Sequence, residues 1–389
     1  MWIPFTNRSF SVGRTSAIPL ALVLLLGLSL TRCDSLPDHG PASFARVSVM
    51  SQNLYLGGPI FRLVEDPACE ATAQNPIAPA LCADQIYGQI EASDFAARAE
   101  AIADEIASAR PALVGLQEVS TFYTQIPADN FPNGPNTPAT DVTIDFLDLL
   151  LDALADRGLA YSAVSANLNL DLELPATPDG QTFYDVRYQD EDVVLALDAP
   201  DVTTGATNEV TFETLFEFVI AGIPLELGRG YQTVDATVDG HSFTFVNTHL
   251  EIAEIAPIRD AQAAELDAAI QAIAGSVILV GDLNGTPEET GTAPYAVLTA
   301  TLSDVFDRPN LEAQPTCCQA PDLQNEESAL DKRIDYVLYR DFHLVRSAET
   351  VLDEPDDRVE SGGQLLWPSD HAGVRARLVH NPRQGGPNA

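Results

Sequence analysis

Positive charge is scarce in this 389-residue sequence: Lys332 is the only lysine, and 20 basic residues face 57 acidic ones. The first 32 residues carry three arginines and no acid, so the rest of the chain has 17 basic residues against 57 acidic ones, a net charge of −40. Charge of this sign repels nucleic-acid phosphates, and no basic stripe offsets it. The composition therefore argues against tight, charge-driven binding of duplex DNA.

Cysteine and long apolar runs are also scarce. The five cysteines include no CxxC spacing, which argues against a zinc–cysteine site. The apolar segment at residues 17–30 is shorter than the roughly 20 residues that a membrane-spanning helix needs. A hydrophobic share of 46 % is nevertheless ample for a packed core, so the composition excludes a disordered acidic protein.

The apolar segment belongs to a predicted signal peptide, residues 1–32. Arg8 and Arg14 precede it and polar residues follow it, as in secretory signals. Cys33 comes next, at the position where a bacterial lipoprotein carries its lipidated cysteine. The lipoprotein cleavage box requires a small residue just before that cysteine, and Arg32 departs from this pattern. We therefore expect export to the periplasm, the outer surface or the medium, with either membrane anchoring through a lipidated Cys33 or ordinary cleavage nearby.

Export makes the four remaining cysteines candidates for disulfides. A Cys69–Cys82 bridge is the economical pairing, because it closes a short loop. Cys317 and Cys318 are adjacent, and a bridge between neighbours is strained but feasible. We expect the first bridge and leave the second pair open.

Hydrophobic periodicity predicts alternating helices and strands. Helices are expected at residues 94–109, 145–157 and 258–273. Strands are expected at residues 47–53, 112–116, 161–164, 193–197, 232–238, 242–247, 277–280, 334–339 and 373–379. Asp239-Gly240 between two of these strands is a strong hairpin signal. This irregular alternation indicates mixed β-sheets with helices outside.

Polar residues stand where several of these apolar strands end. They are Asn53, Gln117-Glu118, Asn247-Thr248-His249, Asp282-Leu283-Asn284, Asp335 and Asp370-His371. One such residue alone could be a helix cap or a turn former. Six cases indicate a shared site. A carboxylate at the end of an apolar strand is costly to bury unless it is paired or bound to metal. Carboxylates and amides suit a hard cation such as Mg²⁺. Together with two histidines they point to phosphoryl chemistry.

The same strand ends carry six short motifs in a fixed order. They are Ser51-Gln52-Asn53-Leu54, Gly115-Leu116-Gln117-Glu118-Val119, Asn247-Thr248-His249-Leu250, Gly281-Asp282-Leu283-Asn284, Arg333-Ile334-Asp335-Tyr336 and Ser369-Asp370-His371. This series resembles the signatures of the endonuclease/exonuclease/phosphatase superfamily. That superfamily includes pancreatic-type deoxyribonucleases, abasic-site endonucleases, neutral sphingomyelinases and inositol-polyphosphate 5-phosphatases.

The resemblance implies an α/β fold, a four-layer sandwich of two mixed β-sheets flanked by helices. Because the first and last motifs lie at opposite ends of the chain, one site must gather the whole of it. We therefore expect a single domain at residues 47–380, preceded by a linker at residues 33–46 and followed by a disordered tail at residues 381–389.

The resemblance also implies a metal site. Glu118 matches the principal metal carboxylate, and Asn53 and Asp370 match its neighbours in the metal shell. Mg²⁺ retains several waters and needs few protein carboxylates, so this sparse set is sufficient. The expected cofactor is Mg²⁺, with Mn²⁺ or Ca²⁺ as alternatives.

The remaining motif residues match catalytic positions. His371 would assist the attacking water or stabilise the charge that follows, with Asp335 fixing its tautomer. Asp282 would orient or deprotonate that water, and Asn284 would hold the phosphate or position Asp282. His249 would donate to a non-bridging phosphate oxygen.

Two substrate contacts are weaker assignments, Asn247 beside His249 and Arg187. Arg187 could clamp a phosphate with both ends of its guanidinium, or it could be an ordinary strand arginine. The apolar segment 211–225 could be an exposed hairpin that touches lipid, but apolar residues on both faces favour a pair of core strands.

The expected function is metal-dependent hydrolysis of a P–O bond in a phosphodiester such as a phospholipid headgroup or a small phosphodiester, by a monomer. A secreted nuclease acting on DNA or RNA is the alternative, and a non-catalytic binding protein on the same scaffold is a third reading. Pro368 further predicts that Asp370 and His371 lie in a loop before the last strand, with Asp335 within hydrogen-bond reach of the His371 ring.

Overall fold

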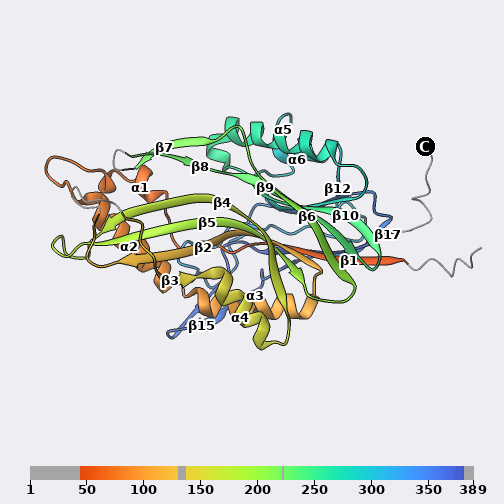
Figure 1. The fold of residues 1–389 in the computed structure, drawn as a ribbon, viewed down its shortest axis with the longest axis horizontal. Helices are drawn as coiled ribbons and strands as arrows, with labels where there is room; N and C mark the ends of the chain where they lie inside the picture. Colours follow the sequence, from red (N-terminus) through yellow and green to blue (C-terminus); the bar gives the residue numbers. More distant parts are fainter. Residues whose placement is uncertain (1–43, 130–136, 221–222, 381–389) are drawn as a thin grey trace, which may run out of the picture. The chain divides into compact units, whose positions relative to one another are not determined.

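A computed structural model describes residues 44–129, 137–220 and 223–380 (Figure 1). The predicted signal peptide, Cys33 and the predicted tail lie outside the described residues. The described residues belong to one unit by their contacts. In this part of the chain, no helix is both long enough and apolar enough to span a bilayer.

The first sheet has seven strands, and its ladder runs β14-β17-β1-β2-β5-β4 with β3 beside β2. Their bounds are β14 Leu344–Val351, β17 Gly373–His380, β1 Ala45–Asn53, β2 Leu113–Gln125, β5 Tyr184–Leu197, β4 Tyr161–Ala176 and β3 Asp141–Asp145. Only β1 and β2 pair in parallel, and the other pairs are antiparallel. The strand at β1 starts two residues before the expected domain boundary.

The second sheet has six strands in the order β12-β13-β11-β10-β9-β6. Their bounds are β12 Ser303–Asp304, β13 Asp335–Arg340, β11 Val277–Asp282, β10 His241–His249, β9 Gly230–Val238 and β6 Val202–Thr211. Here β10 and β11 are the parallel pair. Asp239 and Gly240 both have positive φ, 51° and 78°, between the antiparallel β9 and β10, which is the hairpin turn that the sequence predicts.

The two sheets pack face to face over a buried apolar core. Val49 and Val194 of the first sheet meet Phe245 and Ile278 of the second in this cluster. Helices α2 (Ala78–Ala92), α3 (Phe95–Ala109) and α4 (Phe146–Asp156) cover the outer face of the first sheet, and α5 (Ala256–Ala272) and α6 (Pro294–Leu298) cover that of the second (Figure 1). The four-layer sandwich is therefore confirmed.

The helices begin at capping residues. The Asp94 carboxylate accepts from the Ala97 amide at the start of α3, so the N-cap is Asp94. Asp145 caps α4 in the same way, accepting from the Asp148 amide at 3.0 Å. The sequence patterns did not predict α2.

The α2 region is held by a disulfide. Cys69 ends a short helix, η1 (Pro67–Cys69), that follows α1 (Arg62–Glu65), and Cys69 is bonded to Cys82 in α2. This is the expected pairing. Cys317 and Cys318 form the second disulfide.

A small hairpin corrects one expectation. Segments β7 (Phe216–Ile220) and β8 (Ile223–Leu227) pair only with each other, so they are not strands of either large sheet. Phe218 packs against the outer core of the first sheet, whereas Val219 is 59 % exposed. The remaining short elements are η2 (Ala253–Ile255), η3 (Pro355–Asp357), β15 (Val359–Ser361) and β16 (Gln364–Leu366).

Candidate active site

Sheet register brings the strand-end residues to one edge of the sandwich. Because β10 and β11 are parallel, His249 stands opposite Asp282. Asp335 begins the antiparallel strand β13, so it pairs with Asp282 at the same edge. In the other sheet, Asn53 at the end of β1 is paired with Gln117 within β2, and this is the last pair of that parallel ladder. The topology therefore collects residues that are far apart in the chain.

A close approach of the two sheets joins the halves of this edge. A Cβ atom built on Gly115 of β2 would overlap Val280 and Asn247 of the facing sheet. Only glycine fits where the sheets are this close. Asn53 then reaches across the gap, and its amide donates to Asp282 Oδ2 at 3.3 Å.

The loop before β17 supplies the last two site residues. Ser369 Oγ donates to the Asn53 carbonyl at 2.7 Å and accepts from the His371 amide at 3.1 Å, so the loop is attached to the end of β1. Asp370 and His371 precede the first residue of β17. His371 Nδ1 lies 2.8 Å from Asp335 Oδ2, so the predicted loop and the predicted acid–histidine contact are both confirmed.

His371 is cationic in this setting. Burial alone would lower its pKa, but the carboxylates of Asp335 and Asp370 outweigh burial and raise the pKa well above its usual value. Its Nε2 lies 3.8 Å from Asp282 Oδ2. The ring therefore presents positive charge to the centre of the site.

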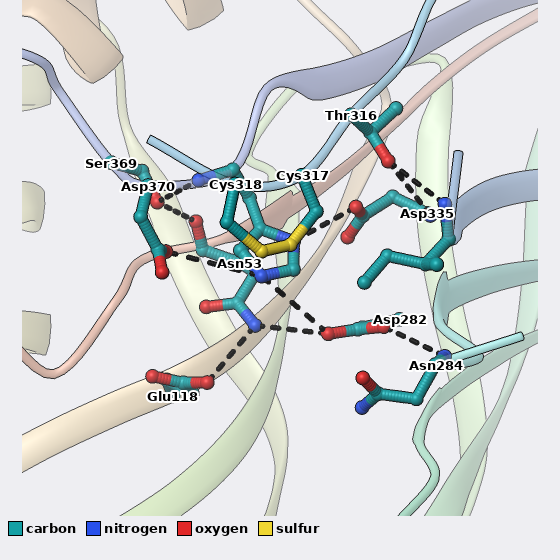
Figure 2. Close-up of a disulfide and its surroundings, with 12 residues drawn as sticks. Asn53, Glu118, Asp282, Asn284, Thr316, Cys317, Cys318, Asp335, Ser369 and Asp370 are labelled. Carbon is teal, nitrogen blue, oxygen red and sulfur yellow. Dashed lines mark hydrogen bonds and ion pairs between the residues drawn. A yellow bond between two sulfur atoms is a disulfide. The ribbon is translucent and has the colours of Figure 1, made fainter. Parts of the chain in front are cut away.

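Two of the three candidate metal ligands, Asn53 and Glu118, contact each other (Figure 2). Asn53 Nδ2 donates to Glu118 Oε1 at 3.1 Å, and the other Glu118 oxygen accepts from the Leu56 amide at 2.9 Å. Glu118 has a φ of 56° where the β2–β5 register shifts, so a bulge re-aims this side chain. Because of the bulge, the Glu118 side chain does not follow the regular alternation of side chains between the two faces of β2.

The surroundings of Asp370 fit a cation held by Asn53, Glu118 and Asp370. Asp370 Oδ1 is buried without a hydrogen-bond partner. Burial, together with the charge of Glu118, raises its pKa to about 7. Its nearest charged neighbour is His371 Nε2, 3.9 Å from Oδ1. Carboxylate and amide oxygens that still lack a hydrogen-bond donor are the ligands that a hard divalent cation binds. Separately, Asp282, Asp335 and His371 offer ligand atoms within 4.8 Å of one another.

Asp282 lies at the centre of the site. Its Oδ1 accepts from the Asn284 amide at 2.9 Å, and its Oδ2 lies 3.4 Å from His249 Nε2. Burial and the nearby Asp335 raise the pKa of Asp282 to about 7. Figure 2 shows the contact between Asn284 and Asp282. Asn284 has a φ of 48°, and its side-chain NH₂ donates to the Leu250 carbonyl, so its amide is held in place. Asp282 can therefore exchange a proton near neutral pH.

His249 is held in one neutral tautomer. Its Nδ1 lies 2.6 Å from Arg229 Nη1, and a guanidinium can only donate, so Nδ1 carries the lone pair and Nε2 the proton. Burial, the charge of Arg229 and the charge of His371 lower its pKa well below the usual value. His249 therefore points an N–H toward Asp282.

Arg229 and Arg98 are functional residues that sequence reasoning missed. Arg98 of α3 is fully buried and donates to the carbonyls of Leu54 and Pro368, at 2.7 and 3.0 Å. It thereby ties the end of β1 to the loop that carries Asp370. Both arginines act on distant parts of the chain, and no local pattern marks them.

Thr316 and the second disulfide lie beside Asp335 and His371. Thr316 Oγ1 accepts from the amides of Ile334 and Asp335 at the start of β13. Cys317 forms an isolated antiparallel bridge with His371, and Figure 2 shows the Cys317–Cys318 disulfide beside the acidic cluster. This segment therefore packs directly against the site.

Two predicted substrate contacts do not join the cluster. Asn247 is fully buried between the sheets, where Gln117, Gln232 and a backbone carbonyl occupy its amide. Arg187 is taken up by Asp171, which its guanidinium contacts at 2.7 and 2.5 Å. The polar atoms of both side chains therefore form hydrogen bonds outside the cluster.

Comparisons with known proteins identify the family and the fold. The model of the endonuclease/exonuclease/phosphatase family matches residues 86–371. A search of curated proteins finds no match. A solved endonuclease/exonuclease/phosphatase family protein from Bacteroides thetaiotaomicron superposes with a TM-score of 0.53 at 14 % identity, covering 90 % of this chain and 100 % of that one.

Two further solved structures are more distant. Caenorhabditis elegans TDP2 gives a TM-score of 0.46 at 17 % identity, covering 86 % of this chain and 97 % of that one. A mannosyl-6-phosphatase from Bacteroides thetaiotaomicron gives 0.48 at 14 % identity, covering 85 % and 99 %. The family model covers more than half of the chain, and the fold is shared: this chain belongs to the endonuclease/exonuclease/phosphatase family.

Proposed function

We propose that this protein hydrolyses a P–O bond of a phosphodiester by attack of water, with a divalent cation as cofactor. The observation that carries the proposal is that Asn53, His249 and His371 surround Asp282; the first two end strands β1 and β10, and the third lies in the loop before β17. One acidic group among polar N–H groups is what an in-line displacement at phosphorus requires.

The cation would be held by Glu118, Asp370 and Asn53, and we propose Mg²⁺, with Mn²⁺ or Ca²⁺ as substitutes. When bound, it would neutralise charge on the phosphoryl group. The unpartnered Asp370 oxygen supports this assignment.

The chain's own residues perform the proton transfers. Asp282 accepts a proton from the attacking water, whose oxygen bonds to phosphorus as the bond to the leaving alkoxide breaks; the alkoxide then takes a proton from solvent, and Asp282 returns its proton to solvent. His249 donates its Nε2 proton as a hydrogen bond to a non-bridging oxygen, and the His371 cation stabilises the charge that develops. Asn284 contacts the phosphate or positions Asp282.

Two alternatives are outcomes of the same experiment. A nuclease would cleave plasmid DNA or RNA, which the net charge of −37 disfavours. A binding protein on this scaffold would retain ligands and hydrolyse nothing. The retained Glu118, Asp282 and His371 argue for catalysis.

The test is a metal-supplemented substrate screen. Bis(p-nitrophenyl) phosphate, sphingomyelin, plasmid DNA and inositol phosphates are each incubated with Mg²⁺, Mn²⁺, Ca²⁺ or EDTA. We expect metal-dependent release from the small diester and the lipid. Glu217→Gln, a change at an exposed acid on the separate hairpin, is the matched control for site variants. Absence of hydrolysis under every metal would contradict the proposal.

We further propose that the chain is exported and acts as a monomer. The N-terminal segment with Arg8 and Arg14 supports export. Mass spectrometry of the mature N-terminus distinguishes a lipidated Cys33 from ordinary cleavage, and light scattering reports the oligomeric state.

A further inference from the structure

The Cys317–Cys318 disulfide adjoins both partners of the acid–histidine contact. On one side, the Cys317 amide donates to the Lys332 carbonyl at 2.9 Å, and the Lys332 amide donates to the Cys317 carbonyl at 3.0 Å. Lys332 stands three residues before Asp335. On the other side, Cys317 forms an antiparallel bridge with His371. One residue of the disulfide therefore lies between the two segments that carry the pair.

The residues that flank the disulfide attach to the same loop. The Gln319 amide donates to the Asp370 carbonyl at 2.9 Å, and the Ala372 amide donates to the Thr316 carbonyl at 2.8 Å. These two bonds lie on either side of His371 in the sequence. The backbone around the disulfide therefore sets where His371 stands relative to its acid partner.

The sulfur atoms lie beside the His371 ring. Both sulfurs and a nitrogen of this ring lie within 4.8 Å of one another (Figure 2). A disulfide has no S–H group, so it does not compete with Asp335 for the ring. Two thiols at the same place would offer competing donors and acceptors. The oxidised form is therefore the one that leaves the acid–histidine contact undisturbed.

This bond contributes little to the stability of the whole fold. A disulfide stabilises a protein mainly by closing a loop of the unfolded chain, and the effect grows with the length of that loop. Here the sequence separation is 1, so almost no loop is closed. The bond instead closes a small ring through the peptide that joins its own two residues, and this ring restricts their backbone torsions. Its effect is therefore local.

We propose that the Cys317–Cys318 disulfide is a positioning element of the active site, which holds His371 against Asp335. The inference rests on the proposed function. Reduction by a dithiol transfers two electrons and two protons: the dithiol becomes a disulfide, and Cys317 and Cys318 become thiols. The ring then opens, the backbone that pairs with His371 regains torsional freedom, and turnover falls.

Exposure separates this disulfide from the first one. Cys318 is exposed, whereas Cys69 and Cys82 are only 1 % and 5 % exposed. Exposed disulfides are the ones that thiols reduce readily. A dithiol at low concentration should therefore reduce the Cys317–Cys318 bond first, and the buried bond serves as an internal control.

The experiment treats the full oxidised chain with dithiothreitol and measures hydrolysis of methyl p-nitrophenyl phosphate, a diester, with Mg²⁺. Alkylation of a sample and mass spectrometry identify the thiols. When they are found only at Cys317 and Cys318, we expect kcat to be lower by about tenfold or more, because small displacements of a catalytic group are costly. KM and the melting temperature should stay nearly unchanged, and reoxidation should restore kcat. An unchanged kcat with both thiols present overturns the inference.

Variants separate the bond from the reductant. Cys317→Ser/Cys318→Ser has no bond to reduce, so we expect a lowered kcat without reductant and no response to dithiothreitol. Cys69→Ser/Cys82→Ser is the matched control, and it should keep both the kcat of the oxidised protein and the response. A wild-type kcat in the first variant overturns the inference, as does loss of the response in the control.

Hydrogen exchange tests the inference without reference to activity. If no diester is hydrolysed, the proposed function fails, and the exchange of backbone amides still reports whether the bond holds the loop. We expect reduction to speed exchange by about tenfold or more in peptides that contain residues 316–319 and 369–372, with no change in β10. Equal exchange in the oxidised and reduced proteins contradicts the inference.

Discussion

Nδ1 of His249 accepts a hydrogen bond from Nη1 of Arg229 at 2.6 Å, and this contact keeps the proton of the neutral ring on Nε2. The ring therefore faces Asp282 with a donor. A neutral, oriented donor costs no reorganisation when charge develops on a phosphate oxygen.

Replacing His249 should therefore reduce turnover more than substrate binding. We expect His249→Ala to lower kcat by about a hundredfold to a thousandfold, the usual effect of removing one such donor. KM should change by less than threefold. Steady-state kinetics on the methyl p-nitrophenyl diester measures both, and a rise in KM at unchanged kcat would assign His249 to ground-state binding.

The acid–histidine pair yields a second prediction. Asp335→Asn leaves the fold nearly intact but replaces the carboxylate beside His371 Nδ1 with a neutral amide, which removes a charge that raises the pKa of His371. We expect kcat to fall by about 10²- to 10⁴-fold. The melting temperature should stay within a few degrees, and near-normal turnover in this variant would leave the Asp335 contact without a catalytic role.

The first disulfide makes a third prediction. It closes a loop with a sequence separation of 13, for which loss of the crosslink costs about 3 kcal/mol of unfolding free energy. We expect Cys69→Ser/Cys82→Ser to be destabilised by about 2–4 kcal/mol in urea. Peptide mapping without reduction should recover Cys69 and Cys82 linked, and free thiols at both positions in the native protein would refute the pairing.

The fourth prediction concerns acid stability. The His241 ring stacks on His380 at 3.5 Å between centroids and meets the edge of Phe342. Burial and the charge of His380 lower the pKa of His241 to about 4. Because the folded pKa lies below the unfolded value of about 6.5, His241 favours the folded state above pH 6.5, and this contribution is lost as the pH falls from about 6.5 toward 4.

His241→Phe should therefore flatten the pH dependence of stability in that window. Urea midpoints measured between pH 4 and pH 8 report the effect. Parallel curves for the wild type and His241→Phe would show that the pKa of His241 is the same in the folded and unfolded states. Glu217→Gln serves as the surface control.

The sequence predicted the elements that local signals mark. Asp239-Gly240 demands a tight hairpin, and the structure has one there. The strand-end motifs predicted that Asp282, Asp335 and His371 come together, and these residues do so, whereas Asn247 of the same motifs does not join them. Pro368 predicted the loop that frees Asp370 and His371 from the strand alternation.

The sequence did not reveal features that depend on tertiary contacts. Helix α2 has weak amphipathic patterning and is held by the disulfide at Cys82. Arg229 lies buried among acids from other strands, so its importance depends on partners that no local window contains. The sequence left Arg187 open between a phosphate clamp and an ordinary strand arginine, because its partner Asp171 lies sixteen residues away on another strand.

The central claim is that hydrolysis depends on a metal held by Glu118. The most direct test is an Mg²⁺ titration of bis(p-nitrophenyl) phosphate cleavage after EDTA treatment, in the wild type and in Glu118→Gln. We predict no activity without metal, full recovery of the wild type on adding Mg²⁺, and at least a hundredfold lower activity of Glu118→Gln with an unchanged melting temperature in EDTA. Wild-type activity in EDTA, or full activity of Glu118→Gln at low Mg²⁺, would contradict the account.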